Sequence, residues 1–187
     1  MPLTPRETPA PILYIPRPSS WLFWHDQWIR RGARVLDLAC GEGRHALLSA
    51  QRGASVTAVD RDASKLDTGK EAASRLGVTV EWRHLDLEGE WPDLGTFDVV
   101  LVFNFLDRQR MPQIRDLVAP GGLLIMETFL EWQRALGWGP TSEDHLLRPG
   151  ELSALVSPLE PVHGREVFEP LDAGRQRAVA SIVAQRR

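Results

Sequence analysis

Short apolar segments that are typical of β-strands alternate along this chain with segments that are typical of helices. Residues 33–39, 54–60 and 97–106 are apolar runs with β-branched side chains, as expected of strands buried on both faces of a parallel sheet. The intervening residues 43–53 and 62–77 are expected to form helices, and each segment ends at a glycine. Strands that alternate with helices predict βαβ units, and therefore a parallel sheet with helices on both faces.

The rest of the chain extends this pattern and adds one reversal of direction near its end. The further elements expected are helices at residues 19–30, 108–122 and 148–157 and strands at residues 78–86, 122–129, 161–170 and 174–185. A short turn around Gly174 separates the last two strands, so they are expected to pair as an antiparallel hairpin. The sequence thus predicts an α/β fold with a mostly parallel seven-stranded sheet and an antiparallel C-terminal edge strand.

Length and composition limit the class of protein. The chain has 187 residues, of which 43% are hydrophobic and 25% are charged, as in a globular domain. The net charge of -3 gives no basic field for binding nucleic acid or an anionic membrane. The single cysteine, Cys40, cannot form an internal disulfide, and no apolar run approaches the roughly 20 residues of a membrane span. These features predict a cytoplasmic protein and leave its oligomeric state open.

The N-terminal segment differs in composition from the rest of the chain. Prolines recur through residues 1–18 and disfavour a helix there, so this segment is expected to be an extended arm. Residues 19–187 are expected to form one domain. Trp21, Trp24 and Trp28 are spaced three and four residues apart, which predicts that they share one face of the helix that follows the arm.

The stretch VLDLACGEGRHALLSAQRGASVTAVD, residues 35–60, has a glycine-rich turn between two acidic residues. GEGRHA nearly matches a dinucleotide fingerprint, and Asp60 follows Gly41 by 19 residues, as that fingerprint expects. This interpretation favours a nicotinamide-dependent oxidoreductase. Asp37 argues against it, because a carboxylate beside the start of the helix would repel a pyrophosphate bound there.

A cationic nucleoside fits the same residues better. S-adenosylmethionine carries a sulfonium, an ammonium and a ribose, and acids such as Asp37 and Asp60 suit these groups. In such folds ligands bind at the carboxyl ends of the strands, where Asp86 and Asn104 are also expected. The alternative for Asp60 is a cap on the next helix beside Asp62.

Several segments together resemble the Rossmann-like S-adenosylmethionine-dependent methyltransferases. VLDLACGEG is similar to their first motif, HLDLE to the segment that meets the adenine, FDVVLVFNFL to their fourth strand and LVAPGGLLIMETF to the approach to their fifth strand. The resemblance covers about residues 30–187. HLLRPGEL, followed by the terminal strand pair, is loosely similar to the small tellurite-resistance-type methyltransferases.

The resemblance implies a set of cofactor-binding residues, which are Asp37, Ala39, Gly41, Gly43, Asp60, Arg61, Asp86, Leu87, Phe103 and Asn104. By this resemblance the two glycines line the methionine moiety, and Asp37 orients the loop and the ammonium. Asp60 accepts hydrogen bonds from the ribose hydroxyls. Asp86 and the amide of Leu87 bind the adenine, and Phe103 and Asn104 offer oxygen atoms near the ammonium.

Ala39 departs from this family pattern, because it stands where the family often has its first glycine. The substitution predicts an ordinary negative φ at this position.

The implied function is transfer of a methyl group to a small or accessible acceptor. The sequence contains no serine elbow, cysteine cluster or metal-ligand spacing, and it identifies no catalytic residue. Methyl transfer needs few such groups, because in-line positioning of acceptor and methyl provides most of the acceleration. The absence of prolines after Asn104 argues against a DNA or protein amide N-methyltransferase. A second alternative, besides the oxidoreductase, is a non-catalytic S-adenosylmethionine-binding module.

The long connection Leu130–Pro149 is the expected site of acceptor specificity, because connections of this length are usually functional or disordered. Its tryptophans, Trp132 and Trp138, together with those of the N-terminal helix, are expected to close over the acceptor as a lid.

Overall fold

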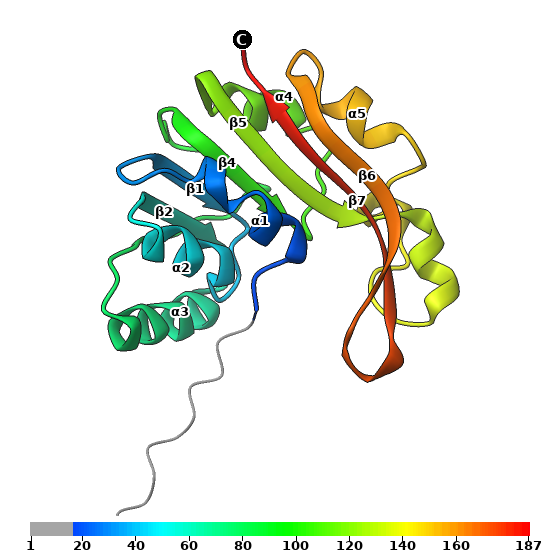
Figure 1. The fold of residues 1–187 in the computed structure, drawn as a ribbon, viewed down its shortest axis with the longest axis horizontal. Coiled ribbons are helices and arrows are strands. Elements are labelled where there is room, and N and C mark those ends of the chain that lie inside the picture. The colour runs from blue at the N-terminus through cyan, green and yellow to red at the C-terminus, as the bar shows by residue number, and fades with distance from the viewer. Residues whose placement is uncertain (1–16) are drawn as a thin grey trace, which may run out of the picture.

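The computed structural model describes residues 17–187, so most of the predicted proline-rich arm lies outside the described residues. Seven strands form one sheet in the order β3-β2-β1-β4-β5-β7-β6 (Figure 1). The strands are β1 (Arg34–Leu38), β2 (Ser55–Asp60), β3 (Glu81–His84), β4 (Phe97–Phe103), β5 (Val118–Phe129), β6 (Glu160–Pro170) and β7 (Gln176–Gln185). β1 to β5 pair in parallel, whereas β7 is antiparallel to both β5 and β6. The predicted sheet and its antiparallel C-terminal edge are confirmed.

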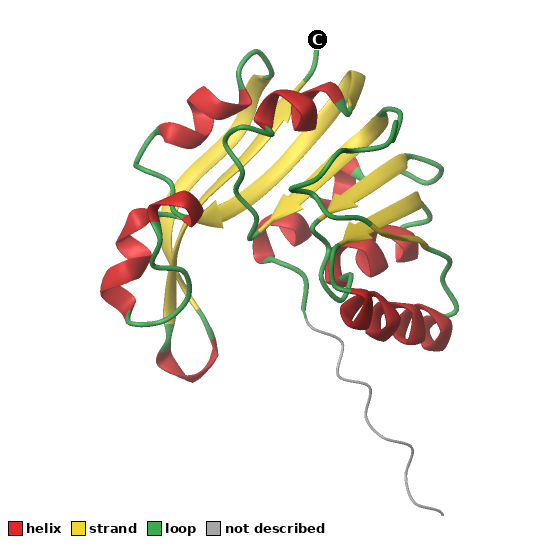
Figure 2. Cartoon of the chain, turned by 180° about the vertical axis from the view of Figure 1, so that it is seen from behind, coloured by secondary structure: helices red, strands yellow, loops and turns green. Residues whose placement is uncertain are grey.

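Helices cover both faces of this sheet (Figure 2). The α-helices are α1 (Ser20–Trp24), α2 (Arg44–Gln51), α3 (Ala63–Leu76), α4 (Met111–Asp116) and α5 (Glu151–Val156), and short 3-10 helices lie at Asp26–Trp28, Glu131–Leu136, Glu143–His145 and Asp172–Gly174. Within residues 17–187, no helix has the length and apolar character needed to cross a membrane.

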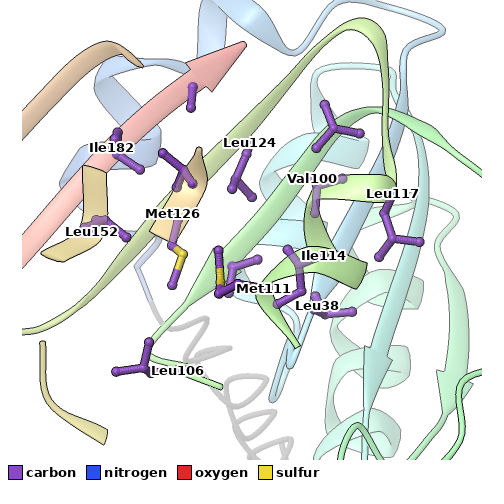
Figure 3. Packing of buried hydrophobic residues seen from close by; sticks show 14 of the residues in the cluster. Leu38, Val100, Leu106, Met111, Ile114, Leu117, Leu124, Met126, Leu152 and Ile182 are labelled. Carbon is purple, nitrogen blue, oxygen red and sulfur yellow. The ribbon is translucent and has the colours of Figure 1, made fainter. Parts of the chain in front are cut away.

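Alternate residues of the central strands belong to two separate hydrophobic clusters, one on each face of the sheet. Leu36 of β1 and Val100 of β4 belong to the cluster under α4 and α5, which Figure 3 shows around Met111. Val35 and Leu101, one residue away on each strand, belong to the cluster under α1, α2 and α3. This twofold alternation between two apolar faces explains why the central strands are continuous apolar runs.

The N-terminal helix is shorter than predicted. α1 ends at Trp24, and a 3-10 turn at Asp26–Trp28 follows it. The break falls at His25, whose Nδ1 lies 2.7 Å from the carbonyl oxygen of Trp21 and whose ψ of 11° leaves the helical range. The prediction that three tryptophans share one face of this helix is therefore wrong for Trp28, which lies beyond its end. Trp21, 4% exposed, and Trp24, 58% exposed, both lie against the guanidinium of Arg165, at 5.0 and 4.8 Å.

The helix expected at residues 108–122 is also shorter. α4 covers Met111–Asp116, and β5 already begins at Val118. The Pro120-Gly121-Gly122 turn lies within β5, where the register against β4 shifts between Phe97 and Val99. Gly121 adopts a φ of 77° there, so the sequence signal that marked a helix end marks an irregularity inside a strand.

A buried polar network joins the N-terminal helix to the antiparallel strands. The Glu127 carboxylate of β5 has no exposed surface and accepts hydrogen bonds from Ser19, Arg165, Arg177 and Ser181, at 2.6 to 3.2 Å. Because its two oxygens are fully surrounded by donors, the charge is accommodated without exposure to water. The network fixes the start of α1 over the end of β5.

The indole of Trp82 fixes how α2 and α3 approach β3. A Cβ atom at Gly43 would lie 2.3 Å from the Trp82 Cη2 atom, and a Cβ atom at Gly69 would lie 2.5 Å from it. Two glycines from different segments therefore form the slot that holds this ring.

We expect Gly69→Ala to destabilise the protein by about 1–3 kcal/mol through overpacking against Trp82. A loss of stability would point to the contact with Trp82, because alanine in a helix is ordinarily favoured over glycine by about 1 kcal/mol. Urea unfolding measures the effect, and the same substitution in a Trp82→Leu background should cost less. A Gly69→Ala protein as stable as the parent would contradict the packing described here.

Candidate functional site

A cleft of about 1040 Å³ lies at the carboxyl ends of the parallel strands. Its lining residues lie at or just after the carboxyl ends of β1, β2, β3, β4 and β5, and they include the first turn of α2. β1 and β4 are neighbours in the sheet, with β2 continuing the order on one side and β5 on the other. The cleft thus lies where strand order reverses, which is the usual ligand-binding position of such sheets.

The loop between β1 and α2 has an unusual backbone. Ala39, Gly41 and Gly43 have φ values of 55°, 58° and 76°. The prediction of an ordinary φ at Ala39 is wrong, because the loop turns left-handed there although the residue is not glycine. Gly41 lines the cleft, and no atom lies within 4 Å of where its Cβ would be. Its open side lets a ligand approach the backbone.

Asp60 holds this loop from the end of β2. Its Oδ2 atom accepts a hydrogen bond from the Gly41 N–H at 2.7 Å, and its Oδ1 atom accepts one from the Asp62 N–H at 2.9 Å. Asp62 itself caps α3, since its side chain accepts from Ser64 and Lys65. Asp60 lines the cleft, and each of its oxygens retains a lone pair for a ligand donor.

Asp37 lies behind the loop and does not line the cleft. It is 1% exposed, and its Oδ2 atom accepts a hydrogen bond from the Ala46 N–H of α2 at 2.9 Å. Burial raises the pKa of this carboxyl to about 7, with the Ala46 hydrogen bond opposing the shift. Asp37 therefore connects the end of β1 to the first turn of α2.

The segment after β3 forms another wall of the cleft. Asp86 is exposed, and its Oδ1 atom accepts from the Glu88 N–H at 3.0 Å. Leu87 is buried, and its backbone N–H donates to no acceptor within residues 17–187. Arg61 reaches across to form an ion pair with Glu88 at 2.9 Å.

Eight of the ten predicted cofactor-binding residues line the cleft; Asp37 and Gly43 do not. Pro140, Asp144 and His145 also line the cleft, and they lie in the connection Leu130–Pro149 in which acceptor specificity was expected. The sequence did not single out the lining residues Glu42, Arg44, Lys65, Glu88, Phe105, Leu106, Asp107, Arg108, Gln109, Thr128 and Phe129. Thr128 and Phe129 were identifiable, because they end the fifth strand as the chosen acids end the second and third.

Two lining residues next to the glycines are not reactive groups. Burial raises the pKa of the Cys40 thiol, and the nearby Asp37 and Asp60 raise it further, so the thiol stays protonated. His45 is 2% exposed, and its Nε2 atom accepts a hydrogen bond from the Ser19 N–H at 3.1 Å. Burial lowers the pKa of His45 well below its ordinary value, so this imidazole is neutral.

The connection after β5 contributes Pro140, Asp144 and His145 to the cleft. Arg108 holds this segment: it forms an ion pair with Glu151 at 2.6 Å and donates to the carbonyl oxygens of Glu143, Asp144 and Leu146. Its guanidinium thereby ties the connection to the start of α5.

The tryptophans expected to form a lid do not line the cleft in the described part of the chain. Trp138 instead donates from its indole to the Gln176 carbonyl oxygen at 3.0 Å, and its ring meets the edge of Phe129. It therefore packs against a ring that lines the cleft. Trp132 stacks on the exposed Phe168 of β6.

Comparison with known proteins relates this site to one family. Residues 35–122 match a family model described as "Methyltransferase domain". A relative from Methylocella silvestris, named "Ubiquinone biosynthesis O-methyltransferase", is 27% identical over 165 residues, which cover 76% of this chain and 64% of the relative. The chain therefore spans just under two thirds of that relative's length.

Solved structures confirm the predicted Rossmann-like methyltransferase fold. An S-adenosylmethionine-dependent methyltransferase from Methanosarcina mazei matches with a TM-score of 0.71 at 20% identity, covering 87% of this chain and 96% of that one. TehB from Haemophilus influenzae matches with a TM-score of 0.67 at 16% identity, covering 88% and 61%. At these sequence identities the similarity to the solved structures shows a shared fold and nothing further.

The buried Asp37 carboxyl predicts a pH-dependent stability. Folding raises its pKa from 3.8 to about 7, so the folded protein takes up a proton between these values. Stability should therefore fall as the pH rises through this window, by at most about 1.4 kcal/mol per pH unit. Asp37→Asn keeps an oxygen for the Ala46 N–H but cannot ionise.

We expect the wild type to lose stability relative to Asp37→Asn between about pH 4.5 and pH 7.5. Urea unfolding at several pH values measures the stability of both proteins. The titration of all other groups cancels in the difference between them. Parallel stability profiles for the two proteins would mean that folding does not raise the pKa of Asp37.

Proposed function

We propose that this chain is a Rossmann-like S-adenosylmethionine-dependent methyltransferase that transfers a methyl group from S-adenosylmethionine to a small-molecule acceptor, which the match to a methyltransferase domain and the shared fold support. The observation that carries this proposal is the position of Asp60 and the open backbone of Gly41 at one cleft, within the matched residues 35–122. The relative from Methylocella silvestris is named for O-methylation in ubiquinone biosynthesis, and from it we propose only that the acceptor is a small molecule.

The groups at the β2 and β3 side of the cleft suit an adenosine. Asp60 has lone pairs for the two ribose hydroxyls while it holds Gly41 and Asp62. The N–H of Leu87, which has no acceptor within residues 17–187, suits a ring nitrogen of adenine, and the exposed carboxylate of Asp86 suits its amino group. Both sets of groups lie on adjacent strands, so one rigid nucleoside reaches them together.

The amino acid end is expected to extend over Gly41 toward β4. Phe103 and Asn104 end that strand and line the cleft, and the φ of 57° at Asn104 turns the chain away from the strand direction. The bound cofactor supplies a methyl group on a sulfonium, which is a good leaving group. The protein contributes chiefly by holding the acceptor atom in line with that methyl and by excluding water.

The acceptor is expected to occupy the β4 and β5 side of the cleft. Phe105, Thr128 and Phe129 line this region together with residues of the connection after β5. The cleft volume of about 1040 Å³ is at the upper end of the range for small-molecule sites, which leaves room for a second ligand beside a nucleoside.

We predict that S-adenosylmethionine and S-adenosylhomocysteine bind with dissociation constants in roughly the micromolar range and that NAD binds much more weakly. Isothermal calorimetry measures all three. A screen of small-molecule acceptors, read out as S-adenosylhomocysteine release, then separates an enzyme from a module that only binds the cofactor. Preference for NAD would replace this proposal with the nicotinamide-dependent alternative.

We predict that Asp60→Asn lowers affinity for S-adenosylhomocysteine about tenfold or more, since hydrogen bonds to a charged acceptor contribute about 1.5–3 kcal/mol each. Asp60 also holds the loop, so the ribose contact needs a separate readout. The wild type should bind the 2′-deoxy analogue of S-adenosylhomocysteine more weakly than the parent compound, and Asp60→Asn should reduce that difference.

Asp62→Ala is the matched control, because it removes a carboxylate two residues away that caps α3 and does not line the cleft. It should lower stability by about 1 kcal/mol and leave ligand affinity unchanged. If Asp60→Asn kept the full discrimination against the 2′-deoxy analogue, Asp60 would serve only to hold the loop.

A further inference from the structure

Strand β6 forms an unpaired edge of the sheet over a long stretch. It comprises 11 residues, Glu160–Pro170, and it ends the strand order (Figure 1). Within residues 17–187 it pairs only with β7, and the N–H and C=O groups on its outer side have no backbone partner. A row of unpaired backbone groups is a template on which another strand can form hydrogen bonds.

The opposite edge of the sheet is protected against such pairing. β3 has only four residues, and its charged side chains Glu81 and Arg83 form an ion pair at 2.8 Å. Short, charged edge strands discourage pairing with other chains. In β6 the backbone is blocked near the two ends, where Pro161 and Pro170 lack an N–H group. Residues 162–169 between these prolines are therefore open to a partner strand.

Exposed apolar side chains gather around β6. Val162 and Phe168 belong to the strand, Trp132 stacks on Phe168 with ring centroids 5.6 Å apart, and the Trp24 ring of α1 lies 4.8 Å from the guanidinium of Arg165. Arg165 and Phe168 point to opposite faces of the strand, because side chains alternate along it. Within residues 17–187 the exposed large hydrophobic side chains are Phe23, Trp24, Trp132, Val162 and Phe168, and each lies on β6 or on an element that contacts it. Apolar surface that gathers in this way marks a contact with another protein.

The charges of β6 restrict how two copies of this strand can pair. Two identical edge strands pair in antiparallel about a twofold axis that passes through one residue of each copy, because directly opposite residues share a face of the sheet. An axis at Arg165 or at Glu166 would place identical charges opposite each other. An axis at Gly164 would place His163 opposite Arg165. Like charges in these positions destabilise a strand pair.

An axis at Val167 gives a complementary arrangement instead. It places Arg165 of each copy opposite Glu169 of the other, which is an attractive pair formed twice. Arg165 and Glu169 already form an ion pair within each copy at 2.9 Å, so this face of the dimer gains no unpaired charge. On the opposite face, Phe168 and the Trp132 ring stacked on it lie close to the axis and to their symmetry copies.

We propose that β6 is a self-association edge, through which two copies of this chain pair in antiparallel over residues 165–169 with the twofold axis at Val167. The two seven-stranded sheets would then form one continuous sheet. The proposal concerns a surface outside the cleft and does not depend on the function proposed above.

Cross-linking through introduced cysteines tests this register. Val167→Cys places two thiols opposite each other at the axis, where the Cβ atoms of facing residues lie about 5 Å apart. Val162→Cys is the matched control: Val162 is on the same strand and 40% exposed, but its two copies would lie about 33 Å apart along the paired strands. We expect a short bifunctional thiol reagent to cross-link Val167→Cys and not Val162→Cys. The parent chain, whose Cys40 is buried, gives the background.

Sedimentation velocity of the full chain at several concentrations measures the association itself. We expect the wild type to shift with rising concentration from 21.0 kDa toward twice that mass. Phe168→Glu places a carboxylate opposite Glu166 of the other copy, twice in the dimer, and should weaken the dimer about tenfold or more. Adding Glu166→Arg to this variant makes each repulsive pair attractive and should restore the dimer. Glu166→Arg alone places an arginine opposite Phe168 and should remain dimeric.

The proposal is overturned if the wild type keeps the mass of a monomer at every concentration. It is also overturned if Phe168→Glu associates as tightly as the wild type, or if Val162→Cys cross-links as efficiently as Val167→Cys, because either result means association through another surface. None of these outcomes bears on the proposed methyl transfer, which is tested by ligand binding in the cleft.

Discussion

Two carboxylates from neighbouring strands hold the loop on which the rest of the cleft depends. Asp37 of β1 accepts from the Ala46 N–H, and Asp60 of β2 accepts from the Gly41 N–H. β1 and β2 pair in parallel, so both acids arrive at the same edge of the sheet. One acid anchors the start of α2 and the other anchors the turn before it. Together they determine where the cleft floor lies and where the first turn of α2 points.

This arrangement includes two conformational and electrostatic features that cost folding free energy. Ala39 adopts a left-handed backbone, and Asp37 is buried with a pKa near neutrality. Such features persist only where the surrounding structure overdetermines the conformation, and they are frequent at ligand sites. The glycines on either side of Trp82 supply part of that constraint, because the indole leaves no room for a side chain at Gly43 or Gly69. Gly43 is thus required by packing, and Gly41 by access to the cleft.

The sequence predicted those features that follow from local patterns. Apolar runs identified the strands, and the resemblance to a methyltransferase family, carried by motifs at the strand ends, identified eight residues that line the cleft. It failed where a distant contact decided the outcome. The N-terminal helix breaks at His25, whose Nε2 atom lies 3.1 Å from the Nδ1 atom of His163 in β6. Arg44 was passed over, because an arginine at the start of a helix resembles a solvated residue, and only the structure shows that it has no carboxylate partner within residues 17–187.

The position of Asp37 in the structure weakens the electrostatic argument against a bound dinucleotide. From the sequence, the charge of Asp37 was expected to repel a pyrophosphate. In the structure Asp37 lies behind the loop with a pKa of about 7, so that repulsion is weak. Arg44 and the first N–H groups of α2 provide positive potential at the same place. Local charge therefore does not by itself exclude a phosphate.

The choice against a dinucleotide rests on the wider frame around the loop. The matched segment runs from β1 into β5, and Asp60, Asp86 and Leu87 line one side of its cleft. Asp60 offers lone pairs to one ribose, and the Asp86 carboxylate and the Leu87 N–H offer an acceptor and a donor to one base. This side of the cleft therefore suits one nucleoside, which is the number that S-adenosylmethionine carries, whereas a dinucleotide carries two.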